Sequence, residues 1–233
     1  MLSLVVPTLN AEAGLARMLE TVRAGVDDIV VADGGSTDRT LAIPVGTRIV
    51  ACPPGRGTQL AAGAAAAGGD WLLFLHADTV LATGWREEAD RHMRESPDRA
   101  AVFRLAFDDS AAAAERVARL ANWRARTFGL PYGDQGLLIS RRLYDAVGGF
   151  RPLPLMEDVD LVRRLGRSRL AFLETAAVTS AERYRRDGWL RRPARNLFCL
   201  GLYFLGLPPP LIAKIYRSQE VSRPNRPCQS TQP

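Results

Sequence analysis

The chain has 233 residues, 47% of them hydrophobic, and a net charge of +6. This length and composition support one large folded domain or two small ones and exclude general disorder. Three separated cysteines without C-x-x-C spacing argue against a disulfide framework or a zinc site, and no apolar run reaches the 18 residues of a membrane span. Since the chain starts on a strand-like segment, we expect no signal peptide and a reducing, cytoplasmic setting.

Short apolar runs alternate with helical stretches along most of the chain. We expect strands at Leu2–Val6, Ile29–Ala32, Arg48–Ala51, Trp71–Leu75, Ala101–Phe107 and Leu137–Ser140. We expect helices at Asn10–Ala24, Thr37–Ile43, Gly57–Ala67, Gly84–Arg94, Ala111–Thr127, Arg142–Val147 and Asp158–Gly166, with Asn10 as the N-cap of the first. This alternation predicts β-α-β units and an α/β fold with a mostly parallel central sheet.

The character of the sequence changes past residue 180. Arginines cluster at 183–195, and then come an apolar run of 11 residues, Leu197–Leu207, and a short expected helix, Leu211–Arg217. We expect a catalytic domain over 1–181, a basic and apolar helical extension over 182–217, and a disordered tail over 218–233. The extension either packs on the catalytic domain or makes peripheral contact with the inner face of a membrane. No nucleic-acid-binding motif accompanies the charge, so no nucleic acid is expected.

A histidine and a carboxylate follow the run Trp71–Leu75. A run this short and apolar predicts a strand buried on both faces, and ligands collect beyond the carboxyl ends of such strands. There His76 and Asp78 could hold a divalent metal, Mn²⁺ or Mg²⁺. His76 taken singly is equally consistent with a structural histidine.

Three further segments combine charged residues with strand ends or helix starts. Asp33 precedes two glycines in a strand-to-helix turn and could bind a base or ribose, or the segment is a plain capped turn. Arg56 and Gly57 open a helix, which suits an anion, although a solvated surface turn is as consistent. Glu157 and Asp158 also open a helix; one is a candidate general base, or both only favour the helix dipole.

The order and spacing of these segments resemble the family-two glycosyltransferases of A-type fold. The resemblance runs through Val5–Asn10, Asp33–Asp38, His76–Asp78 and Glu157–Asp158, and covers about residues 2–217. A histidine before Ala77-Asp78, together with Tyr132–Gly136 and Pro154–Asp158, is similar to the subset named for association with radical-SAM and selenium-related domains. The resemblance implies a single Rossmann-like nucleotide-diphospho-sugar transferase domain with C-terminal helices.

The resemblance also implies a role for each matching residue. Pro7, Thr8 and Asn10 border the nucleoside pocket, Asp33 binds the base or ribose, and Arg56 and Gly57 lie along the diphosphate. Asp78 binds the metal, Asp158 deprotonates the acceptor beside Glu157, and Gly133, Asp134 and Gln135 line the sugar and acceptor side. The sequence departs from the family pattern at Ala11, where a glutamate is common, and at His76, which replaces an acid.

The function expected from these features is metal-dependent, inverting sugar transfer. The donor would be a UDP- or GDP-linked sugar, and the acceptor a hydroxyl compound that could be lipid-linked. One candidate base and no evident nucleophile favour inversion. Two alternatives stay open: a sugar-phosphate nucleotidyltransferase, and a catalytically silent sugar-nucleotide or membrane-binding module. A nucleotidyltransferase would need a glycine-rich loop with a basic residue after the first strand, and this sequence has none there. A catalytically silent module would not need Asp78 together with Glu157 and Asp158.

Overall fold

An eight-stranded sheet forms the centre of the computed structural model, which describes residues 1–43 and 46–221. The strands are β1 (Leu2–Thr8), β2 (Asp28–Asp33), β3 (Arg48–Ala51), β4 (Trp71–Phe74), β5 (Thr79–Leu81), β6 (Ala100–Phe107), β7 (Leu137–Ser140) and β8 (Leu170–Thr179). They lie in the order β3-β2-β1-β4-β7-β6-β8-β5. Pairs β1–β2, β1–β4, β2–β3 and β6–β8 are parallel, and β4–β7, β6–β7 and β5–β8 are antiparallel. The expected mostly parallel sheet is confirmed.

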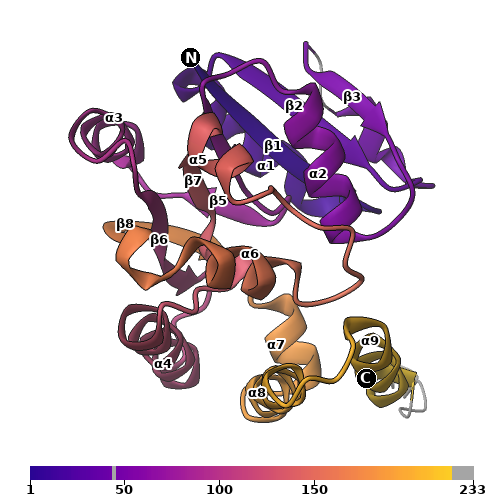
Figure 1. Ribbon diagram of the computed structural model, residues 1–233. Helices are drawn as coiled ribbons and strands as arrows, with labels where there is room; N and C mark the ends of the chain where they lie inside the picture. Colours follow the sequence, from indigo (N-terminus) through magenta and orange to yellow (C-terminus); the bar gives the residue numbers. More distant parts are fainter. Residues whose placement is uncertain (44–45, 222–233) are drawn as a thin grey trace.

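Helices cover both faces of the sheet (Figure 1). They are α1 (Glu12–Val22), α2 (Arg56–Ala66), α3 (Trp85–Glu95), α4 (Ala112–Phe128), α5 (Arg141–Ala146), α6 (Glu157–Leu165), α7 (Glu182–Asp187), α8 (Arg191–Phe204) and α9 (Pro209–Val221). Alternate residues of β1 supply the two cores. Leu4 and Val6 pack towards α1 and α3, whereas Val5 packs towards α2, α5 and α6. Apolar side chains on both faces explain why a strand such as β4 is a continuous apolar run.

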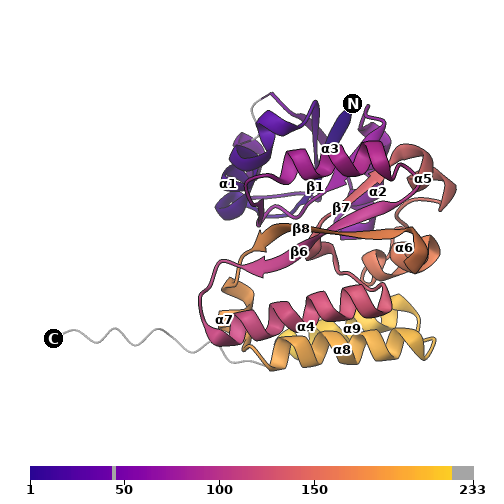
Figure 2. The same ribbon diagram turned by 90° about the vertical axis from the view of Figure 1, so that its left-hand side faces the viewer.

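The C-terminal helices pack on the domain through a third cluster. Met156, the N-cap of α6, and Val159 of α6 pack with Cys199 and Leu200 of α8 and Ile212 of α9. Figure 2 shows α4, α8 and α9 together at one end of the molecule. No helix in the described part of the chain is long and apolar enough to cross a membrane.

Several expected elements differ in the structure. The expected helix Thr37–Ile43 is only a 3₁₀ turn over Arg39–Ala42, which Asp38 caps by accepting a hydrogen bond from the Thr40 amide. Asn10 is not the N-cap of α1. Ala11 holds that position, and Asn10 adopts a φ of 52° and accepts a hydrogen bond from the Thr37 amide (2.9 Å). The Asn10 side chain therefore ties two loops together.

Other differences concern elements that were not expected or end elsewhere. Strands β5 and β8 and helix α7 were not predicted, since β5 has three residues and β8 is only partly buried. Helix α9 continues to Val221, so residues 218–221, expected in the tail, are helical. The rest of the expected tail, 222–233, lies outside the described residues.

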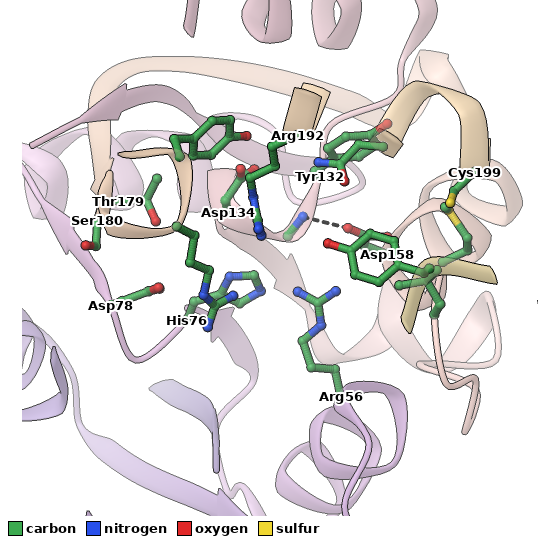
Figure 3. A pocket seen from close by; sticks show the side chains of 17 residues that line it. Arg56, His76, Asp78, Tyr132, Asp134, Asp158, Thr179, Ser180, Arg192 and Cys199 are labelled. Atoms are coloured by element: carbon green, nitrogen blue, oxygen red, sulfur yellow. Dashed lines mark hydrogen bonds between the residues drawn. The ribbon is translucent and has the colours of Figure 1, made fainter. Parts of the chain in front are cut away.

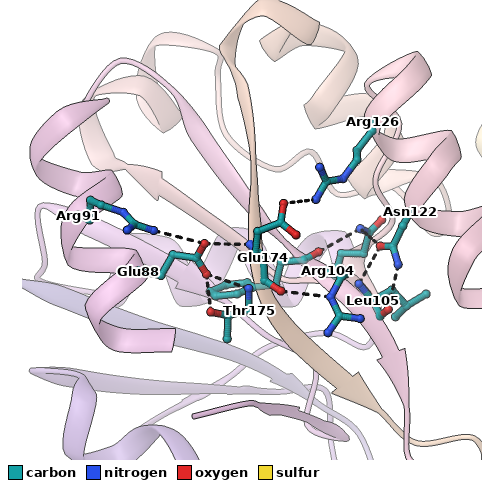
Figure 4. A network of polar contacts seen from close by, with 10 residues as sticks. Glu88, Arg91, Arg104, Leu105, Asn122, Arg126, Glu174 and Thr175 are labelled. Atoms are coloured by element: carbon teal, nitrogen blue, oxygen red, sulfur yellow. Dashed lines mark hydrogen bonds and ion pairs between the residues drawn. The ribbon is translucent and has the colours of Figure 1, made fainter. Parts of the chain in front are cut away.

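A polar network holds β8 against β6 where their pairing is interrupted (Figure 4). The Glu88 carboxylate accepts hydrogen bonds from the amides of Glu174 and Thr175, each at 2.9 Å, at a bulge of β8. On the other side of β6, the Asn122 amide pairs with both the N–H and the C=O of Leu105, at 2.9 and 3.0 Å. Side chains thus replace the missing strand contacts of β6.

Candidate functional site

The carboxyl ends of β1, β4, β6 and β8 meet at one edge of the sheet, and a cavity of about 570 Å³ opens there. It is lined by the loop between β1 and α1, the start of α2, the loop after β4 and the end of β8. The lining residues include Pro7, Thr8, Asn10, Arg17, Arg56, His76, Asp78, Asp108, Arg183 and Arg217. The cavity therefore lies where ligands bind in open α/β sheets.

Backbone hydrogen bonds fix the loop that carries His76 and Asp78. The Thr79 amide donates to the His76 carbonyl (3.1 Å), which closes a turn into β5. The Ser180 amide donates to the Asp78 carbonyl (3.2 Å), which ties the loop to the end of β8. As expected, both side chains follow a buried strand and face one cavity (Figure 3).

His76 is a neutral imidazole in this environment. Burial, reinforced by the Arg56 charge and partly opposed by Asp78, lowers the pKa of His76 to about 4. Gly133 packs so closely on the ring that a Cβ there would lie 2.8 Å from Nε2. A neutral imidazole can bind a metal, which an imidazolium cannot.

The residues here fit a divalent cation shared with a ligand. The described residues contain no cluster of three or more His, Cys, Asp or Glu side chains suited to a metal. Asp78 and His76 offer a carboxylate and an imidazole, and Mg²⁺-type sites are commonly completed by substrate phosphates and water. An open site of this kind suits an ion that arrives with a diphosphate.

Arg56 joins the cavity to the core of the domain. Its Nε lies 2.8 Å from Oε1 of Glu157, whose side chain is only 2% exposed. Burial raises the pKa of Glu157, partly opposed by the Arg56 charge. Glu157 lines neither this cavity nor the one described next. It positions Arg56 from beneath and does not face the reaction space.

A smaller cavity of about 110 Å³ adjoins the first (Figure 3). The two share Arg56, His76, Asp78, Ser180 and Arg183. The far wall of the smaller cavity comes from the C-terminal helices, through Tyr184, Arg192, Asn196, Cys199 and Tyr216. The sequence had shown the arginine cluster but gave no sign that Tyr184, Asn196 and Tyr216 would join the site. Arg17, on α1, was also missed.

Two carboxylates face the smaller cavity in different states. Asp158 accepts hydrogen bonds from the amides of Gly133 (2.8 Å) and Val159 (2.7 Å). Oδ1 of Asp134 is buried without a hydrogen-bond partner in the described residues. Burial raises the pKa of Asp134 to about 6, partly opposed by Arg124. The cavity therefore holds one oriented carboxylate and one that is poised to exchange a proton near neutral pH.

Asp33 has its hydrogen-bonding capacity occupied within the chain. It accepts from Thr8 Oγ1 (2.9 Å), from the amides of Gly35 (2.9 Å) and Ser36 (2.8 Å), and from the Ser36 hydroxyl. Burial raises its pKa, but the hydrogen bonds outweigh that effect and hold the pKa below its usual value. Asp33 is 3% exposed and is not among the lining residues of either cavity. Here it joins the turn after β2 to the end of β1 at Thr8.

Two other expected site residues also lie outside both cavities. A Cβ at Gly57 would lie 2.3 Å from the Arg151 carbonyl oxygen, so this glycine lets α2 pack on the loop before α6. Gln135 is 1% exposed and donates through Nε2 to the Phe103 carbonyl (3.1 Å). It also donates to Asn122 Oδ1 (3.3 Å), which joins it to the network beside β6.

Comparisons with known proteins place these features in a family. The model of the family described as "Glycosyl transferase family 2" matches residues 3–152. Glucosyl-3-phosphoglycerate synthase from Mycobacterium tuberculosis is 35% identical over 94 residues, which cover 34% of this chain and 29% of the synthase. A PGL/p-HBAD biosynthesis glycosyltransferase from Mycobacterium bovis is 37% identical over 93 residues, 35% of this chain and 36% of that protein. The matches thus span about a third of these relatives.

Solved structures share the fold. The M. tuberculosis synthase in complex with Mn²⁺ and UDP-glucose aligns with a TM-score of 0.58 at 21% identity, over 77% of this chain and 71% of that one. Residues 1–349 of S. aureus TarS in complex with UDP align with a TM-score of 0.59 at 17% identity, over 95% of this chain and 72% of that one. The expected A-type glycosyltransferase fold is confirmed.

Proposed function

The chain belongs to glycosyl transferase family 2, and from this membership we propose that it moves a sugar from a UDP-linked donor to a hydroxyl acceptor. The observation that carries the proposal is the junction of the two cavities at Arg56, His76 and Asp78. The larger cavity has the size and the arginines for a nucleoside diphosphate, and the smaller one has the carboxylates for an acceptor hydroxyl.

The geometry supports a metal-dependent, inverting reaction. The acceptor oxygen forms a bond to the anomeric carbon while the bond from that carbon to the donor diphosphate breaks. The acceptor proton passes to a carboxylate, for which we propose Asp158, and negative charge accumulates on the diphosphate. Arg56 and Arg183 face that charge from the shared wall. Mn²⁺ or Mg²⁺ at His76 and Asp78 would neutralise it further when bound.

The ligands of a related structure support a UDP-linked donor and a divalent ion for this chain. The synthase structure described above holds Mn²⁺ and UDP-glucose, and its acceptor is phosphoglycerate in a further complex. For this chain, GDP-linked donors and lipid-linked acceptors stay predictions. The radical-SAM-associated subset also stays one, with His76 and Tyr132–Gly136 as its support. Cys52 and Cys199 are free thiols, which agrees with a reducing compartment such as the cytoplasm.

A panel of nucleotide sugars tests the proposal. UDP-, GDP- and dTDP-sugars would each be offered with Mn²⁺ or Mg²⁺, and both thermal shift and nucleotide release would be measured. We expect UDP-sugars with Mn²⁺ to raise the melting temperature and to release UDP when an acceptor is present. If no nucleotide sugar binds in the presence of metal, the proposed function is wrong.

A further inference from the structure

Helix α8 carries large apolar side chains on its outward face. Its inward face is mixed: Arg192, Asn196 and Cys199 line the smaller cavity, and Cys199 and Leu200 pack in the apolar cluster with α6 and α9. Its outward face, with the flanking positions, exposes between 50% and 85% of each large side chain: Leu190, Leu197, Phe198, Phe204 and Leu205. A surface helix of a soluble domain normally turns polar residues outward, so this apolar outward face is unusual.

The neighbouring helix α4 extends this surface. Figures 1 and 2 both show α4 running alongside α8 at the same end of the molecule. On α4, Leu120, Trp123 and Phe128 are 65%, 57% and 56% exposed. We call these three residues and the five around α8 the outer apolar face. Single exposed apolar residues are ordinary, but eight large ones on neighbouring helices at one end of the molecule indicate a surface that binds something.

Positive charge surrounds the outer apolar face. Helix α4 has four arginines and one glutamate, a net +3, and residues 188–217 have four arginines, one lysine and no acid, a net +5. These two segments together exceed the +6 of the whole chain, so the remainder is net negative. Not all of this charge faces solvent, because Arg192 and Arg195 are 12% and 11% exposed and pair with Asp187. The exposed basic side chains at this end include Arg116, Arg119, Arg191 and Lys214. The charge is therefore concentrated where the apolar side chains are.

We propose that the outer apolar face docks on an anionic lipid bilayer. Leucine, phenylalanine and tryptophan side chains enter the interface, while arginines bind the acidic headgroups. A second copy of this chain is a poorer occupant, because a symmetric contact would bring two strongly positive surfaces together. The anionic bilayer matches both the apolar and the charged part of the surface.

Docking would also place the smaller cavity next to the bilayer surface. The helix that lies on the bilayer with one side forms the wall of that cavity with the other, through Arg192 and Asn196. An acceptor anchored in the bilayer would reach the cavity along α8. This last step rests on the proposed function, whereas the docking itself does not.

Vesicle sedimentation of the full chain tests the docking. The probes are vesicles of phosphatidylcholine alone and of an equimolar mixture with phosphatidylglycerol, at low and high salt. We expect sedimentation with the anionic vesicles, weakened by salt, and little with the neutral ones. The double variant Phe198→Ser, Leu205→Ser should reduce anionic binding at least about tenfold. The control Leu41→Ser, Ile49→Ser changes two apolar residues outside the face that are 43% and 44% exposed, and should bind like the original chain.

The outcomes separate the possibilities. Absence of sedimentation with both vesicles, or equal loss in the control variant, overturns the proposal. The proposal is also overturned if the chain binds no vesicles but forms a dimer in analytical ultracentrifugation, and if the Phe198→Ser, Leu205→Ser change dissociates that dimer. This result would assign the face to a second copy. Vesicle binding without binding of any nucleotide sugar would leave the docking intact and refute the proposed function alone.

Discussion

The two cavities that meet at Arg56, His76 and Asp78 are built by different means. The larger one lies at the ends of paired strands, so backbone hydrogen bonds place its residues. The far wall of the smaller one comes from α7, α8 and α9, which side-chain packing around Met156 and Cys199 holds in place. The sheet can keep the geometry of the larger cavity, where we propose that the donor binds, through many sequence changes. The helices that form the wall of the smaller cavity can change its shape, and with it the proposed acceptor, without altering the larger cavity.

The largest effect is expected from a change at Asp78, one of the residues that both cavities share. Asp78→Asn should lower transfer by at least about 10³-fold and remove the Mn²⁺-dependent thermal shift with UDP, because the ion loses its only carboxylate on that loop. Steady-state transfer and differential scanning fluorimetry measure the two effects. Asp145→Asn, an exposed acid elsewhere, is the control. Full metal-dependent binding in Asp78→Asn would remove Asp78 from the site.

The next change acts on the acceptor side alone. Asp158→Asn should lower transfer by about 10² to 10⁴-fold, because the amide cannot accept the acceptor proton. Donor binding should stay within about twofold, since Asp158 does not line the larger cavity. Calorimetric titration with UDP and Mn²⁺ measures donor binding. Unchanged transfer would exclude Asp158 as the base, and lost donor binding would show that the two cavities are not separable in this way.

A backbone change tests how rigidly the two regions are joined. Gly57→Ala should lower the free energy of unfolding by about 3 kcal/mol, because its Cβ would lie 2.3 Å from the Arg151 carbonyl oxygen. Gly201→Ala is the matched control: it is also helical, but a Cβ there has no neighbour within 4 Å. Urea unfolding of both variants measures the difference. Equal stability would mean that the loop before α6 yields without cost.

The smallest expected effect concerns the buried acid of the smaller cavity. Because the pKa of Asp134 is raised to about 6, the native state binds its proton more tightly than the unfolded chain does. That contribution to stability is complete below pH 3.8 and is lost as the pH rises through 6. Asp134→Asn should therefore be more stable than the original chain by at most about 3 kcal/mol at pH 8 and nearly equal to it near pH 3. Thermal unfolding across that pH range measures it, and a constant difference would contradict the raised pKa.

The elements that could be predicted from sequence are those whose identity is local. Strand β4 is apolar on both faces, and the loop after it carries His76 and Asp78 as expected. Strand β8 could not be predicted, because Glu88 from α3 holds its bulge and that contact joins distant parts of the chain. Asn10 was wrongly expected as a cap for a similar reason, since its partner is Thr37 in another loop.

The site divides in the same way. One cavity or the other is lined by seven of the expected site residues: Pro7, Thr8, Asn10, Arg56, Asp78, Asp134 and Asp158. Asp33, Gly57, Gln135 and Glu157 lie in the same segments but face the protein interior, where they hold loops and helices in position. A motif fixes which segments meet, but the side of each segment that faces the ligand depends on packing that the motif does not contain.

The loop that contains Gln135 has a consequence for solubility. Between β6 and β7 the described register contains only the Ala101–Leu138 pair, so the following stretch of β6, which pairs with β8 on its other side, has no strand on its β7 side. Gln135 and Asn122 occupy the backbone groups of Phe103 and Leu105 there. An open strand edge recruits strands from other molecules, and these two amides deny it that opportunity. The same short loop that presents Asp134 to the cavity therefore also protects the protein from aggregation.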